Sequence, residues 1–177
     1  CHLPSCRCCD SSIPREISAV PQFILRTFDD DLEERFWPLI KTVIDGSPRD
    51  SSGCKISPTF FINSLWTDWH TVSMAFSSQC EIASHTRSHL ADPSMSLSEW
   101  VDEIISVVED ATRHGNVSRG AVVGFRAPNL LWTPQSLDAL AELGFKYDSS
   151  FGETVRVYFP RLYQDHARLT DIYTENQ

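Results

Sequence analysis

Acidic and imidazole side chains occur in two short segments of this chain, at a spacing that suits a metal centre. Asp29 and Asp30 follow the apolar run 23–25, and His85 and His89 lie four positions apart after residues 81–84. One carboxylate and two imidazoles form a zinc ligand set that leaves a coordination position open. The carboxylate left over would lie beside the metal, where a general base belongs. The spacing therefore predicts a metal-dependent hydrolase.

Each of these residues also has a commoner structural explanation. An Asp pair after a strand usually caps a helix and compensates its dipole, and two His four positions apart often share a solvated helix face. Arg126 could simply pair with a surface acid. Their placement after successive strands is what favours a site. A different enzyme class, the non-haem iron oxygenases, uses the same ligand set of two His and one carboxylate and remains an alternative.

Strand and helix patterns alternate along the chain. Apolar runs predict strands, and apolar residues at helical spacing, bounded by caps and by Gly or Pro, predict helices. The expected strands are 22–28, 59–62, 81–84, 121–125 and one that begins at 145, with helices at 32–43, 67–77, 96–115 and 133–143. This alternation predicts an α/β fold with a parallel sheet or barrel, whose active-site loops follow the strands.

The domain organisation predicted from the sequence is simple. Residues 1–20 form an irregular Cys-rich arm, and residues 21–177 form one catalytic domain. A complete eight-fold barrel needs about 250 residues. The chain of 177 residues opens at Cys1, and we therefore expect a mature form or a fragment that ends before the last strands of a barrel.

Charge and cysteine content limit the partners and the compartment. The net charge of −9 and the pI near 5.0 argue against nucleic acid and against anionic membranes. Four of the six cysteines lie within residues 1–9, which is typical of a disulfide-stapled secreted protein, although reduced thiols or a zinc knuckle are alternatives. The sequon 116–118 also points to secretion. We expect an extracellular protein.

Three of these segments resemble a known family. Residues 27–30, 84–89 and 126–128 (TFDD, SHTRSH and RAP) resemble the first three signature motifs of the polysaccharide deacetylases, carbohydrate esterase family four. The resemblance to animal-type chitin deacetylases also includes the Cys-rich arm ending in 21–24 and the segments 53–55 and 144–150. It runs from residue 1 to about residue 151 and implies a distorted (β/α) TIM-like barrel that here lacks its last strands.

The resemblance also implies a reaction and a role for each site residue. Asp29 would be the general base and Arg126 would orient it, while the backbone N–H of Asn129 would stabilise the oxyanion. The metal, usually Zn²⁺ although another divalent ion is possible, would be bound by Asp30, His85 and His89. The implied reaction is the hydrolysis of N-acetyl groups from N-acetylglucosamine polymers, above all chitin.

The chain departs from the family pattern in its last part. The resemblance implies a general acid on a late Leu-x-His motif, but His166 lacks that context. A catalytically silent chitin-binding or matrix protein of the same fold is therefore an alternative. Asp31 stands where the family usually has a small residue, so Asp30 and Asp31 could exchange roles. Cys80 replaces a common Gly and could pair with Cys54 or with a Cys outside this chain.

Two tryptophans follow the second predicted strand, at positions 66 and 69. The flat apolar face of a Trp ring suits a sugar ring, so Trp66 is a candidate for substrate binding. Trp69 is more simply explained by packing of the next helix.

Overall fold

The computed structural model describes residues 25–49 and 52–151, so the predicted arm 1–20 and His166 lie outside the described residues. Five strands form one parallel sheet in the order of the chain. They are β1 (Thr27–Asp30), β2 (Thr59–Ile62), β3 (Glu81–Ser84), β4 (Gly124–Phe125) and β5 (Tyr147–Asp148). Sequential order without a reversal is the topology of a (β/α) barrel wall and not of a doubly wound sheet. The predicted α/β class is confirmed.

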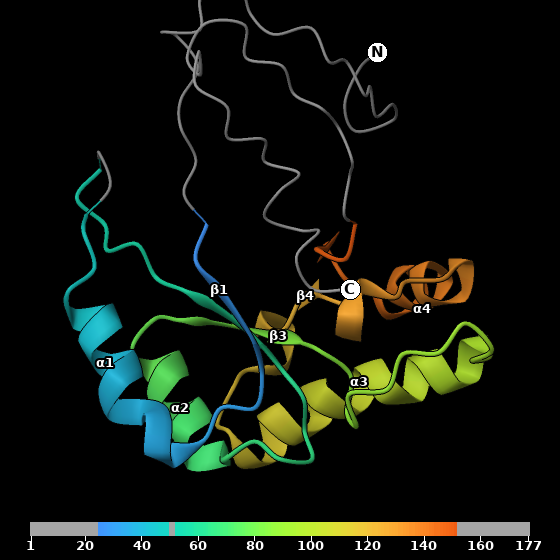
Figure 1. The fold of residues 1–177 in the computed structure, drawn as a ribbon, viewed down its shortest axis with the longest axis horizontal. Helices are drawn as coiled ribbons and strands as arrows, with labels where there is room; N and C mark the ends of the chain where they lie inside the picture. The colour runs from blue at the N-terminus through green and yellow to red at the C-terminus, as the bar shows by residue number, and fades with distance from the viewer. Residues whose placement is uncertain (1–24, 50–51, 152–177) are drawn as a thin grey trace, which may run out of the picture.

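Helices connect successive strands and lie along one side of the sheet (Figure 1). The α-helices of the described residues are α1 (Trp37–Asp45), α2 (Trp69–Ser77), α3 (Leu97–His114) and α4 (Pro134–Leu143). Short 3-10 turns form η2 (Glu34–Phe36), η3 (Arg119–Ala121) and η4 (Pro128–Leu130). No helix among the described residues is long and apolar enough to cross a membrane.

Local sequence explains where the later helices begin and end. Ser96 and Glu99 form a reciprocal capping box at the start of α3, which satisfies two backbone N–H groups that a helix end leaves free. Thr133 caps α4 in the same manner, with Pro134 in the first turn. Gly144 ends α4 with φ = 73°, a left-handed conformation that glycine adopts without steric cost.

The first predicted strand and helix were placed too early in the chain. The strand is Thr27–Asp30, while Leu25 is 87% exposed and residues 22–24 lie outside the described residues. Parallel pairing with β2 sets these bounds, because Thr27 aligns with Thr59 and Asp30 with Ile62. The helix begins at Trp37, since Pro38 has no N–H and fits only the first turn.

The fourth predicted strand was too long. Residues 119–121 form η3, and only Gly124 and Phe125 belong to β4.

The apolar core lies between the sheet and the helices and consists of two clusters. In the first, Phe60 and Ile62 of β2 and Ile82 of β3 pack against buried side chains of α1, α2 and α3. In the second, Trp100 of α3 is fully buried and meets the ring of Phe125 edge-on, with centroids 6.4 Å apart. These clusters fix the sheet against the helices and hence the positions of the loops at the strand ends.

Cys80 belongs to the first cluster and is not joined to Cys54. Its thiol is free among the described residues and 3% exposed. Burial raises the pKa of this thiol to about 11, so the side chain behaves as a small apolar group at neutral pH.

We predict that Trp100→Ala lowers the free energy of unfolding by about 3–5 kcal/mol, the usual cost of removing a buried aromatic ring. Denaturant unfolding followed by circular dichroism measures this change. Trp66→Ala is the matched control, because Trp66 is 59% exposed and its loss should cost less than about 0.5 kcal/mol. Equal losses in both variants would contradict this placement of the core.

Candidate metal centre and active site

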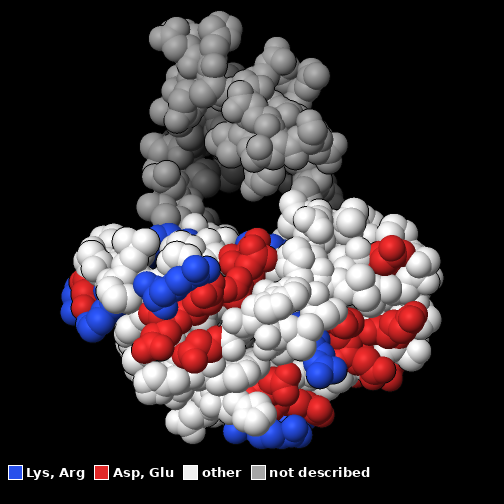
Figure 2. Space-filling model, turned by 60° about the horizontal axis from the view of Figure 1, so that its bottom comes forward, with Lys and Arg blue, Asp and Glu red and all other residues white. Residues whose placement is uncertain are grey.

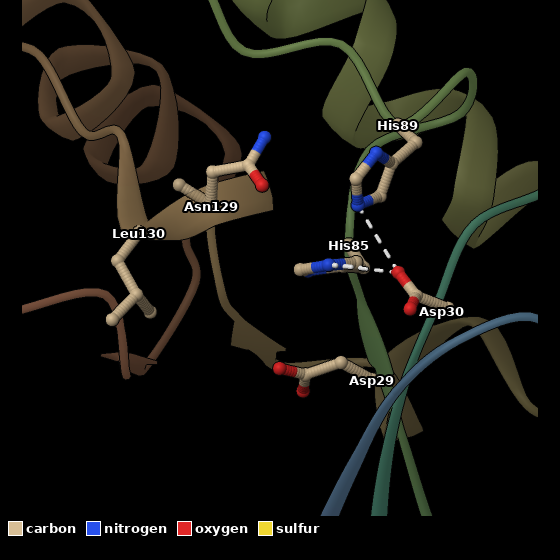
Figure 3. Close-up of a pocket in the computed structure, with 7 residues that line it drawn as sticks. Asp29, Asp30, His85, His89, Asn129 and Leu130 are labelled. Carbon is tan, nitrogen blue, oxygen red and sulfur yellow. Dashed lines mark ion pairs between the residues drawn. The ribbon is translucent and has the colours of Figure 1, made fainter. Parts of the chain in front are cut away.

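Five of the seven sequence-predicted site residues line one cavity at the carboxyl end of the sheet, and Arg126 and Trp66 do not. A cavity of about 250 Å³ is lined there by Asp29, Asp30, His85, His89, Ala127, Asn129 and Leu130. Asp29 and Asp30 are the last residues of β1, His85 follows β3 directly, and Asn129 belongs to η4 after β4. Asp31 is not among the lining residues. Figure 3 shows the two histidines and Asp30 on one side of the cavity and Asn129 on the other.

Three of these side chains turn their ligand atoms toward one another. The Oδ1 atom of Asp30 lies 3.6 Å from Nε2 of His85 and 3.1 Å from Nε2 of His89. Ligand atoms bound tetrahedrally at zinc–ligand distances near 2.0–2.1 Å are roughly 3.3 Å apart. The two separations from Asp30 are close to this value, and all three ligand atoms lie within 4.8 Å of one another, so the three residues could hold a divalent metal ion.

His85 is held in the tautomer that a metal ligand needs. Its Nδ1 lies 2.7 Å from the carbonyl oxygen of Arg126, and because a carbonyl can only accept, Nδ1 carries the proton. The lone pair of Nε2 is then directed at Asp30. Burial lowers the pKa of His85, which keeps the imidazole neutral near pH 7.

Asp29 is held by an arginine from a different strand end. Nη1 of Arg126 donates to Oδ1 of Asp29 over 2.6 Å and to the Thr27 hydroxyl over 3.2 Å. The guanidinium lies 4.1 Å from the ring centroid of Phe61. Charge-assisted hydrogen bonds of this length fix a carboxylate firmly. Asp29 thus stands beside the three ligand residues with its carboxylate oriented toward the cavity (Figure 3).

The segment after β5 holds Arg126 in turn, a role that sequence reasoning missed. The Ser149 hydroxyl accepts from Nη2 of Arg126 over 2.8 Å, and its carbonyl accepts from Nε over 3.3 Å. The Ser150 hydroxyl accepts from the backbone N–H of Ala127 over 2.7 Å. The sequence predicted a strand beginning at 145 and a family resemblance over 144–150, but no contact with Arg126. The signal for their role was their polarity at the end of a strand.

Asn129 reaches the cavity through an unusual backbone conformation. Asn129 and Leu130 have φ values of 53° and 58°, so the chain turns sharply after Pro128. Asn tolerates this left-handed region better than most residues. Both residues line the cavity, with Asn129 on the side opposite the two histidines (Figure 3).

Trp66 lies outside the cavity lining and is 59% exposed, next to Leu65 at 53%. Its backbone N–H donates to Oδ1 of Asn63 over 3.3 Å, which fixes the start of the loop after β2. Trp69, in contrast, packs against the first core cluster, as its position in the sequence predicted.

The fold and this arrangement define a class: an α/β protein with a parallel sheet and a candidate metal site at the carboxyl end of its strands. The sequence profile described as "Polysaccharide deacetylase" matches residues 18–147. The chain therefore belongs to the polysaccharide deacetylase family, as the three motifs indicated.

A curated relative points to the same family. The chain is 30% identical to Chitin deacetylase 1 of Bombyx mori over 171 residues, which is 92% of this chain and 31% of the relative. The chain thus spans about a third of this relative's length.

Solved structures share the fold. A family 4 carbohydrate esterase from Streptomyces lividans, in complex with acetate, matches with a TM-score of 0.58 at 16% identity, over 71% of this chain and 60% of that one. A family 4 acetyl xylan esterase from Clostridium thermocellum, in complex with a cobalt ion, matches with a TM-score of 0.55 at 18% identity, over 65% of this chain and 53% of that one. At such low identity these likenesses support the fold alone.

We predict that the protein binds one zinc ion and that His89→Ala weakens binding by at least about 100-fold, because a direct ligand is lost. Isothermal titration calorimetry of the metal-free protein at neutral pH measures both values. His70→Ala is the control, since His70 lies on the exposed side of α2. A variant that binds zinc as tightly as the unaltered protein would contradict this ligand set.

Proposed function

We propose that the protein hydrolyses N-acetyl groups of N-acetylglucosamine polymers, with chitin as the principal substrate and zinc as the metal. The observation that carries the proposal is the position of Asp29, held by Arg126 beside Asp30, His85 and His89. A metal ligand set next to a fixed free carboxylate is what hydrolysis by an activated water requires. The chitin deacetylase of Bombyx mori supports the choice of polymer.

The residues divide the reaction between them. Asp30, His85 and His89 would hold the ion, which supplies Lewis acidity toward the acetyl carbonyl and lowers the pKa of water. Asp29 takes the proton from the attacking water, and Arg126 keeps its carboxylate in position for that transfer. The backbone N–H of Asn129 donates to the developing oxyanion across the cavity. The carbon–nitrogen bond then breaks, and the proton held by Asp29 passes to the leaving amine nitrogen.

Apolar side chains that follow the strands suit a sugar polymer. Trp66 follows β2, and the rings of Trp132 and Phe151, with centroids 4.4 Å apart, follow β4 and β5. Trp132 is 41% exposed and Phe151 is 51% exposed. Such rings can pack on the flat apolar faces of sugar rings. A neutral polymer also fits a surface on which acidic side chains are widespread (Figure 2).

A secreted location is part of this proposal. Residue 116 of the sequon is exposed in the turn after α3, and α3 runs back from the carboxyl end of the sheet. A glycan attached there would lie away from the cavity. The cysteines of residues 1–9 support an oxidising compartment.

The alternative is a catalytically silent chitin-binding protein of the same fold. One observation favours it: His166 lacks the Leu-x-His context in which the resemblance places the general acid. Such a protein would keep the sugar-binding surface and release no acetate. The following experiment separates the two functions.

We predict that the zinc-loaded protein releases acetate from N-acetylglucosamine oligomers and that Asp29→Asn lowers kcat by about 10²–10⁴-fold, the usual contribution of a general base. An enzyme-coupled acetate assay measures the rates. Zinc titration of the variant is the control, because Asp29 is not one of the three ligand residues. Oligomer binding without acetate release by the unaltered, zinc-loaded protein would favour the silent alternative.

We predict that Trp66→Ala raises KM for long oligomers by about 5–30-fold with little change in kcat, because it removes roughly 1–2 kcal/mol of ring contact made equally in ground and transition states. Steady-state kinetics on oligomers of increasing length measure this split. Leu39→Ala is the matched control, an apolar side chain that is 66% exposed on α1. An unchanged KM would remove Trp66 from the substrate surface.

A further inference from the structure

The two histidines of the candidate metal centre are fixed in different ways. His85 is held by its ring, through the bond between Nδ1 and the carbonyl of Arg126. For the ring of His89, the described residues supply the 3.1 Å contact of Nε2 with Oδ1 of Asp30 and no hydrogen bond to Nδ1. The position of His89 therefore depends on its backbone, and on what holds the loop that carries it.

That backbone is in a conformation that needs support. Thr86 has φ = 64° and His89 has φ = 56°, so two of the four residues from Thr86 to His89 are left-handed. Left-handed φ is costly for residues other than glycine, above all for a β-branched residue such as Thr86. Such conformations persist only where neighbouring groups hold them.

Helix α3 contributes to this support through two consecutive residues. Glu103 accepts two hydrogen bonds from Ser88: Oε2 from the backbone N–H over 2.9 Å and Oε1 from the hydroxyl over 2.8 Å. The carbonyl of Ile104 accepts from the Ser84 hydroxyl over 3.3 Å. The segment from Ser84 to Ser88, which contains His85 and directly precedes His89, is thus tied to α3 at each end.

Glu103 is itself on a rigid part of the molecule. Its neighbour Ile104 is fully buried, as is Trp100 one turn earlier, and both belong to the second core cluster. A carboxylate that uses both oxygens on one residue fixes that residue more strictly than a single bond would. The bond to the N–H of Ser88 acts on the backbone immediately before His89.

We propose that Glu103 is a positioning residue that holds His89 in its metal-binding place through Ser88. This inference rests on the proposed metal site and adds a residue outside the cavity lining. Glu103 touches neither metal nor substrate. It fixes the loop backbone so that Nε2 of His89 stays within reach of the atoms contributed by Asp30 and His85.

The test is zinc titration of Glu103→Gln by calorimetry. Gln has nearly the same shape but only one accepting oxygen, so it can accept only one of the two bonds from Ser88. Its amide N–H can at most donate to the Ser88 hydroxyl in place of the other, and the charge assistance of both bonds is lost. We expect zinc affinity to fall by about 10–100-fold, the usual effect of losing a group that orients a metal ligand. Asp102→Asn is the matched control, one position earlier on the exposed side of α3, and should leave affinity within about twofold.

A double-mutant cycle separates positioning from a general loss of stability. Ser88→Ala should weaken zinc binding in the same direction, and adding Glu103→Gln to it should cost much less than Glu103→Gln alone, because the two changes break the same contact. The unfolding of the metal-free variants is measured alongside. The role of Glu103 would be overturned, with the metal site left standing, by either of two results. One is that Glu103→Gln lowers zinc affinity equally in the unaltered protein and in Ser88→Ala. The other is that the zinc affinity of Glu103→Gln stays within about twofold of that of the unaltered protein. An unaltered protein that binds no zinc would overturn the metal site as well.

Discussion

The bond between Arg126 and Asp29 is the interaction on which the proposed chemistry depends, because it joins the first strand of the sheet to the fourth. The side chain of Arg126 donates to Asp29 and Ser149, and its carbonyl accepts from His85. One residue thereby sets the place of the proposed base and the tautomer of a proposed metal ligand. Its guanidinium lies over Phe61, whose ring is buried in the sheet. A displacement of Arg126 would therefore disturb the proposed base and the proposed metal ligand together.

Much of the site could be predicted from the sequence, since parallel strands bring all their carboxyl ends to one edge. Asp30, His85 and His89 meet there although 59 positions separate the first from the last. The alternation of strands and helices and the caps of α3 and α4 were likewise readable, because Ser96 and Thr133 act on their own helices. Local signals suffice wherever the partner of a residue lies within one turn or at the same edge of the parallel sheet.

The parts that could not be predicted depend on contacts between distant segments. The bounds of β1 follow its register with β2, so the apolar run that ends at Leu25 pointed to the wrong residues. Ser149 and Glu103 are ordinary polar residues in the sequence, and their roles appear only when β5 and α3 are placed beside the site. Sequence spacing identifies the groups that do chemistry more readily than those that hold them.

Two histidines and a carboxylate do not by themselves distinguish a hydrolase from an iron oxygenase. The neighbourhood of the triad supplies the distinction. An oxygenase needs open metal positions for dioxygen and a co-substrate, and a fixed base beside them has no evident use. Here Asp29 lines the same cavity as the triad and is oriented by a 2.6 Å bond from Arg126. A carboxylate held at that place suits proton transfer from a water, and this favours hydrolysis on the geometry of the site as well as on family membership.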